Sequence, residues 1–293
     1  MKISYTKLLP HLPNPCTKVG FYIYDFNTGK TLEHNPDMFI YPASALKIFI
    51  GAEVQRQIET NKLDADSKLM VGQQDKLKQI IYPWTSYCGL ESPGFIEIRK
   101  LLKAMLLYSD NIATNVLADA VGLDNIQGFI DNNGWTGNGF TQKFIEAASS
   151  GKPILKRAVS VVNAKCLCDF MSKLEKDEMD FTSQVMKQNL GSALGRSASK
   201  SEKAKLNGEG HRNTDNRFYD SVYYKGGFLE AGSPRNFLKF IKNGGFNRWQ
   251  AEAGVVKYKD LHYAYGMVSQ YETFIKNRYF KFSRLQKMLE KYL

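Results

Sequence analysis

Residues 39–54, FIYPASALKIFIGAEV, mark a change in the chain from strand-like to helical sequence. Phe39, Ile40 and Tyr41 are strand-forming residues, and the pattern stops at Pro42. From Ser44 onward the segment is rich in apolar residues and contains no proline, which predicts a largely buried helix. The fold class therefore depends on which elements precede and follow this junction in the sequence.

Strand-like sequence precedes the junction and returns late in the chain. Residues 19–26, VGFYIYDF, alternate with β-branched and aromatic side chains, meet Asn27-Thr28-Gly29 and resume at residues 30–32, which predicts a β-hairpin. Three further strands are predicted at residues 221–229, 251–258 and 261–269.

Helical patterns occupy the middle of the chain. Helices are predicted at residues 96–107, 111–121, 123–132 and 158–174, and a last one at about residues 274–293. Residues 135–157 and 195–216 are rich in glycine or polar residues and are predicted to be loops.

This order predicts an α+β fold of the three-layer αβα type, with one antiparallel sheet built from both termini and a helical region inserted between them. Residues 1–293 are expected to form a single unit. Residues 19–43 and 217–293 would supply its sheet part, and residues 44–216 its mainly helical part.

The composition describes an ordinary globular chain with a basic surface. Hydrophobic residues make up 43% and charged residues 24%, and the net charge is +11. The basic residues are scattered and no nucleic-acid-binding motif accompanies them, so we expect a solvated basic face and no nucleic-acid partner. No apolar run is long enough for a transmembrane helix, and the N-terminal sequence lacks the apolar core of a signal peptide. Both a cytosolic protein and one whose signal was removed fit this sequence.

Cysteine and histidine usage gives no reason to expect a metal. The four cysteines are Cys16, Cys88, Cys166 and Cys168. They show no paired metal-ligand spacing, and the last two are expected to be small, partly buried hydrophobes on one helix; disulfides are left open. The four histidines form no H-E-x-x-H motif and no Walker A loop is present, so no metal or nucleotide cofactor is expected.

Ser44 and Lys47 form an S-x-x-K motif at the start of the predicted helix. Their spacing places both side chains on one helix face, where a lysine whose charged form is disfavoured by burial can take the proton of a serine nucleophile. S-x-x-K occurs four times, beginning at Ser4, Ser44, Ser149 and Ser197. Only the second follows a strand-like segment and opens an apolar helix. The alternative is a helix-capping serine with a nearby surface lysine.

Two further motifs carry chemistry. The S-D-N tripeptide at residues 109–111 either caps the helix that follows or supplies a serine that relays a proton and an asparagine that binds a substrate amide. The K-G-G tripeptide at residues 225–227 lies in an apolar, aromatic strand, where glycines let a ligand approach closely. The alternative for Lys225 is an edge-strand lysine that prevents aggregation.

The three motifs are most informative together. S-x-x-K, S-D-N and K-x-G occur in this order, at residues 44, 109 and 225. On these motifs the chain resembles the class A β-lactamases and their penicillin-interacting relatives, from the strand at residues 19–25 to the C-terminal helix. The resemblance implies a serine hydrolase that opens the β-lactam amide through an acyl-enzyme on Ser44.

The resemblance also implies a role for each matched residue. Ser44 would be the nucleophile, Lys47 its activating partner and Ser109 a proton shuttle. Substrate-binding groups would come from Asn111, from Lys225, Gly226 and Gly227, and from the backbone N–H groups of Ser44 and Phe228, which would form the oxyanion hole. Tyr82 or Trp84 is either the aromatic wall at the entrance or an ordinary core or surface residue.

Two positions depart from the family pattern. No E-x-x-x-N motif follows S-D-N, and the nearest candidate for the base that activates the deacylating water is Glu146, with Ser150 four residues later. Without such a base the acyl-enzyme would persist. Gly226 stands where the family has Thr or Ser, and the missing hydroxyl would weaken binding of the substrate carboxylate by about 1 kcal/mol.

Three functions follow from these observations. The first is a β-lactamase, and the second is a D,D-peptidase or slow penicillin-binding protein that deacylates poorly and accepts a D-Ala-D-Ala peptide. The third is a non-catalytic relative that binds peptidoglycan or senses β-lactams. The resemblance implies a periplasmic or secreted protein, although no signal peptide is visible and a cytoplasmic location stays open. We expect a monomer.

Overall fold

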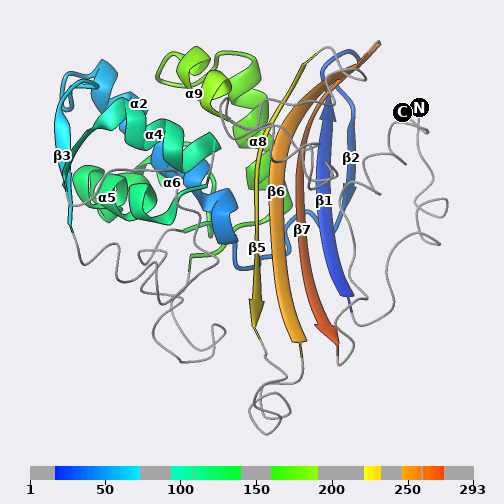
Figure 1. The fold of residues 1–293 in the computed structure, drawn as a ribbon. Coiled ribbons are helices and arrows are strands. Elements are labelled where there is room, and N and C mark those ends of the chain that lie inside the picture. The colour runs from blue at the N-terminus through cyan, green and yellow to red at the C-terminus, as the bar shows by residue number, and fades with distance from the viewer. Residues whose placement is uncertain are drawn as a thin grey trace, which may run out of the picture. The chain divides into compact units, whose positions relative to one another are not determined.

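The structure is a computed structural model that describes residues 17–72, 94–107, 109–139, 160–190, 221–231, 246–258 and 260–273 (Figure 1). The chain divides into two compact units. The first contains Met1–Ala45, Val161–Lys173 and Asp215–Leu293, and the second contains Leu46–Ser160 and Leu174–Thr214.

The first unit contains a five-stranded antiparallel sheet. Its strands, in spatial order, are β2 (Thr31–His34), β1 (Thr17–Asp25), β7 (Leu261–Thr273), β6 (Phe246–Tyr258) and β5 (Ser221–Ala231). β1 pairs with β2 as a hairpin and also with β7, so N-terminal and C-terminal strands share one sheet (Figure 1). This confirms the α+β class and a sheet built from both ends of the chain.

Helix α8 (Ala164–Glu175) belongs to the first unit up to Lys173, and this part packs closely against the sheet. A Cβ atom on Gly266 of β7 would lie 2.0 Å from the carbonyl oxygen of Ala164 and 2.7 Å from the backbone nitrogen of Cys168. The thiol of Cys168 donates to the carbonyl oxygen of Ala264 at 3.4 Å. Cys166 and Cys168 have free thiols and are more deeply buried than the partial burial expected for them.

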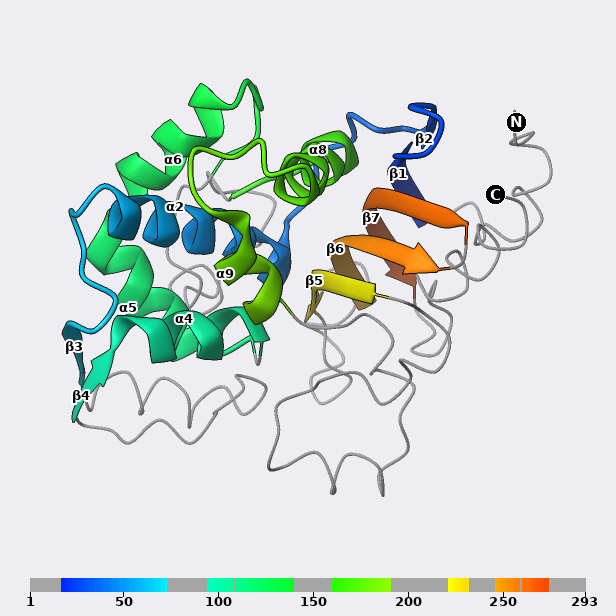
Figure 2. The same cartoon turned by 90° about the horizontal axis from the view of Figure 1, so that it is seen from above.

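The second unit is built around helix α2 (Lys47–Glu59), of which ten of thirteen residues are buried. α2 packs against four other helices of this unit (Figure 2). They are α4 (Ile98–Leu107), α5 (Asn111–Val121), α6 (Leu123–Asn132) and α9 (Ser183–Asn189). A two-stranded sheet of β3 (Lys68–Val71) and β4 (Gly94–Glu97) completes the described part of the unit.

Most predicted elements are present, but β6 begins five residues before the predicted strand and α8 begins six residues after the start of the predicted helix. α4 begins at Ile98 because the preceding residues pair with β3 as strand β4. β3, β4 and α9 were not predicted. The predicted C-terminal helix and most of the two predicted loops lie outside the described residues.

Candidate functional site

Ser44 lies in a single 3-10 helical turn, Ala43–Leu46, that immediately precedes α2. The turn is tied back by the backbone N–H of Ala45, which donates to the carbonyl oxygen of Pro42 at 3.1 Å. Ala43 is buried and has a φ of 48°, a left-handed conformation that costs a non-glycine residue about 1–3 kcal/mol. Such strain tends to occur at functional sites. The side chain of Ser44 is half-buried.

Lys47 is the first residue of α2 and its side chain is fully buried. Its Nζ donates to the carbonyl oxygen of Ser109 at 2.6 Å and to Oγ of the same serine at 3.1 Å. It also donates to Oδ1 of Asn111 at 2.6 Å. Burying an amino group requires such partners, because an unpaired one would lose its hydration without compensation. A surface lysine, the alternative for this residue, is therefore excluded.

The S-D-N tripeptide forms the start of α5, and its three residues have different tasks. Asp110 is the N-cap, and its carboxylate accepts from the backbone N–H of Ala113 at 2.9 Å. Ser109 precedes the cap with a φ of 63°, and Asn111 is the first helical residue. The capping interpretation thus holds for Asp110, while Ser109 and Asn111 bind the lysine. The two interpretations of this motif are compatible.

These contacts assemble an amine, a hydroxyl and an amide from segments more than sixty residues apart in the sequence. The Nζ of Lys47 is within hydrogen-bond reach of the Ser109 hydroxyl, which is the geometry needed for proton transfer between them. The side-chain amide of Asn111 is held by the same amine.

Lys225 lies in β5 of the first unit, at the end of the described strand order. An edge lysine that prevents aggregation must be exposed, but Lys225 is only 4% exposed. It pairs with Ala253 of β6, while Gly226 pairs with Glu252 and Gly227 with Ala251. The backbone of Phe228, opposite Gln250, continues the same strand.

The predicted site residues are thus distributed over the two units. Lys47, Ser109 and Asn111 meet in the second unit, whereas Ser44, Lys225 and the residues of the K-G-G strand belong to the first. Glu146, Tyr82 and Trp84 lie outside the described residues. Across the described ranges no three His, Cys, Asp or Glu side chains gather into a metal-binding group. No helix there is both long and apolar enough to span a bilayer.

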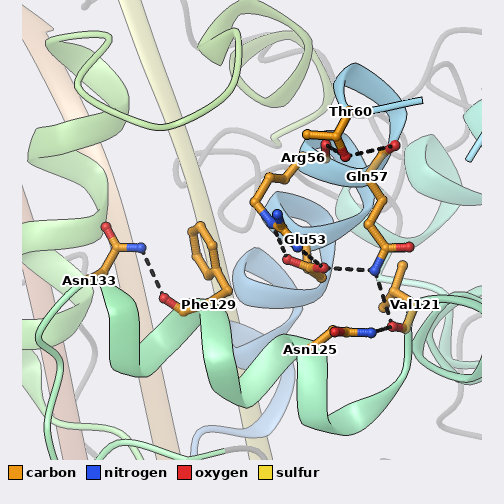
Figure 3. Close-up of polar contacts among 8 residues, drawn as sticks. All are labelled: Glu53, Arg56, Gln57, Thr60, Val121, Asn125, Phe129 and Asn133. Atoms are coloured by element: carbon orange, nitrogen blue, oxygen red, sulfur yellow. Dashed lines mark hydrogen bonds and ion pairs between the residues drawn. The ribbon is translucent and has the colours of Figure 1, made fainter. Parts of the chain in front are cut away.

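A polar network further along α2 was not predicted. Glu53, Arg56 and Gln57 are joined by hydrogen bonds, and Gln57 reaches Val121 at the end of α5 (Figure 3). The available signal was a run of polar residues with helical spacing within a segment otherwise expected to be buried.

Comparisons with known proteins agree with this description. A family profile described as "Beta-lactamase enzyme family" matches residues 7–206. The chain is similar to the TLA-3 extended-spectrum β-lactamase, with 14% identity, a TM-score of 0.67 and coverage of 92% of this chain and 90% of that one. It is similar to the chromosome-encoded β-lactamase of Vibrio parahaemolyticus, with 14% identity, a TM-score of 0.66 and 94% of each chain covered. It is also similar to PBP-A, with 13% identity, a TM-score of 0.64 and coverage of 95% of this chain and 92% of that one. A search of curated protein sequences gives no match.

Proposed function

The chain belongs to the β-lactamase enzyme family, and we propose that it acts through acylation of Ser44, with Lys47 and Ser109 moving the proton. The protein is a serine β-lactamase-like hydrolase. The observation that supports this assignment of residues is the fully buried Lys47, whose Nζ lies 3.1 Å from the hydroxyl of Ser109.

In the acylation step, Oγ of Ser44 attacks the lactam carbonyl carbon and a C–O bond forms. The C–N bond of the ring breaks, and the proton of the serine passes through Lys47 and Ser109 to the departing nitrogen. The base for this step must be an uncharged amine. An uncharged amine has two N–H groups, which suffice for the Ser109 carbonyl and Oδ1 of Asn111, and its lone pair would then face the Ser109 hydroxyl.

The remaining roles in this proposal are those of binding groups. Asn111 would accept or donate a hydrogen bond to the side-chain amide of the substrate, and Lys225 would attract its carboxylate. The backbone N–H groups of Ser44 and Phe228 would stabilise the oxyanion. In deacylation, Glu146 would take a proton from the water that attacks the acyl carbon. The C–O bond to Ser44 then breaks, and Oγ of Ser44 regains that proton.

The substrate proposed for this site is a β-lactam. The intact mass of the protein after mixing with benzylpenicillin, followed over time, tests acylation and release together. We expect an adduct of one penicilloyl group that forms in the wild type and not in Ser44→Ala. Ser197→Ala, which alters another S-x-x-K serine, is the matched control and should behave as the wild type. An adduct that forms on Ser44→Ala would contradict the proposal.

A slow penicillin-binding protein or D,D-peptidase is the second candidate, and one observation favours it. Glu146 has Ser150 four residues later where class A enzymes carry asparagine, so the deacylating base is the least well matched part of the motif set. A point mutant of PBP-A, similar to this chain at 13% identity, was solved as its acyl-enzyme complex with penicillin G. In the same time course, an adduct that persists after free penicillin is removed would identify this function. A D-Ala-D-Ala peptide would then be the substrate to assay.

On the basis of the family assignment we also propose a periplasmic or secreted location and a monomeric state. Light scattering coupled to size exclusion checks the second, for which a mass near 33.3 kDa is expected.

A further inference from the structure

Helices α2 and α5 are tied together at both of their ends. At one end Lys47, the first residue of α2, binds Asn111, the first residue of α5. At the other end Nε2 of Gln57 donates to the carbonyl oxygen of Val121, the last residue of α5, at 3.2 Å. On each helix the residue of the first tie and the residue of the second tie are ten positions apart, which is about 15 Å along the helix axis. The two helices therefore run in the same direction and in matching register.

The second tie is built on a buried charge. The carboxylate of Glu53 is fully buried and accepts from Nε and Nη2 of Arg56, each at 2.7 Å. It also accepts from Nε2 of Gln57 at 2.7 Å (Figure 3). Both groups that Nε2 contacts, the carboxylate and the Val121 carbonyl, are acceptors. The amide nitrogen must therefore face them, and the orientation of the Gln57 side chain is fully determined.

The end of α5 is where such a tie has most effect. The last carbonyl groups of a helix have no partner within it. The carbonyl oxygen of Val121 accepts from Gln57 and also from Nδ2 of Asn125 on α6, at 2.7 Å (Figure 3). Gly122 then ends α5 with a φ of 85°. A displacement of α2 along α5 would break the Gln57 contact and the Lys47 contacts together.

We propose that Gln57, oriented by the Glu53–Arg56 ion pair, is a positioning residue for Lys47. By holding the register of α2 on α5, it sets the distances from Nζ of Lys47 to Ser109 and Asn111. This inference rests on the proposed function, in which Lys47 transfers the proton. A displacement of about 1 Å at such a group lowers reaction rates by as much as about 100-fold.

The chain offers a closely matched pair of variants. Gln57→Leu removes the amide but leaves Val121 bonded to Asn125 and Glu53 bonded to Arg56, so neither acceptor loses all its partners. Gln55→Leu is the control, because Gln55 is on the same helix and 5% exposed against 6% for Gln57. Its amide donates to Glu59 of its own helix, at 2.7 Å. Gln57→Met is a second variant of the tested position should the leucine variant not fold.

Two measurements on the chain of residues 1–293 test whether Gln57 positions Lys47. The first is the rate constant of acylation by benzylpenicillin as a function of pH. We expect Gln57→Leu to lower it about tenfold and to move the midpoint of its pH profile, with Gln55→Leu within about twofold of the wild type at an unchanged midpoint. Equal effects of the two variants would overturn the proposal, since they would reflect a general loss of helix stability.

The second measurement does not require activity. The 13C resonance of the Lys47 Cε, identified by its loss in Lys47→Arg, is titrated in the wild type and in both variants. We expect its position and titration midpoint to change in Gln57→Leu and not in Gln55→Leu. Identical titrations in the wild type and Gln57→Leu would overturn the positioning role. A wild type that is not acylated would instead contradict the proposed function, while the resonance would still test the register.

Discussion

At the scale of single residues, Lys47 connects the sequence to chemistry. It starts a helix, is fully buried and binds Ser109 and Asn111 through one nitrogen. These two residues are themselves unusually placed, because Ser109 has a positive φ and Asn111 follows the cap of α5. Local strain and a buried amine at one point are difficult to explain by packing alone.

Replacing this amine should abolish proton transfer and leave the fold in place. We expect Lys47→Met, which keeps the length of the side chain, to lower the rate of benzylpenicillin acylation by about 100- to 10,000-fold. Lys62→Met, at an exposed position just beyond α2, is the control and should leave the rate unchanged. Intact mass against time gives the rates, and far-UV circular dichroism establishes that both variants are folded. A Lys47→Met protein acylated at the wild-type rate would exclude the lysine from the mechanism.

At the scale of elements, the ends of α5 and α6 agree with the sequence because local signals define them. Asp110 caps α5, and Gly122 adopts the positive φ that separates the two helices. By contrast, β3 and β4 have four residues each, so two side chains per face carry too little periodic pattern to be recognised. α9 is only seven residues long, and tertiary contacts support it.

The contact between α8 and the sheet leads to a second prediction. A methyl group on Gly266 would overlap backbone atoms of α8, which cannot move aside as a flexible side chain can. We expect Gly266→Ala to destabilise the protein by about 1–3 kcal/mol or more. Gly128 in α6 is the matched control, because a Cβ there meets nothing within 4 Å. Gly128→Ala should raise stability by about 0.5–1 kcal/mol.

Urea unfolding followed by circular dichroism measures both changes. Equal stability of Gly266→Ala and the wild type would mean that α8 does not approach the sheet as closely as described. No such contact is visible in the sequence, where Gly266 is one of 23 glycines.

At the scale of the whole molecule, the sequence was most informative about order and least informative about contacts. Strands at both ends and helices between them predicted the sheet, since consecutive patterns report the type of each element. The cluster of Lys47, Ser109 and Asn111 was expected only from the ordered motifs, because residues more than sixty positions apart have no spacing that implies contact. The tie between Gln57 and Val121 was not expected at all, because it depends on how two helices pack.

Buried titratable groups in the first unit make the free energy of unfolding depend on pH in the alkaline range. Burial raises the pKa of Cys168 from its ordinary 9.0 to about 12, and it also raises the pKa of Cys166 and of Tyr41. At pH values between those two figures the unfolded chain has lost the thiol proton that the folded chain keeps. The free energy of unfolding therefore falls as pH rises through this range, by up to about 1.4 kcal/mol per pH unit for each thiol. Below pH 9 both states are protonated and the contribution is constant.

Cys168→Ala isolates the contribution of this thiol from those of the other groups that titrate at high pH. Urea unfolding of the wild type and the variant at about pH 8 and about pH 10.5 gives the four free energies required. The variant should be less stable than the wild type at the lower pH because it loses a packed sulfur atom. Its disadvantage should shrink at the higher pH, since the wild type alone pays to keep this buried thiol protonated. A difference between the two proteins that is the same at both pH values would show that Cys168 ionises as readily in the folded chain as in the unfolded one, which its burial on α8 against β7 does not allow.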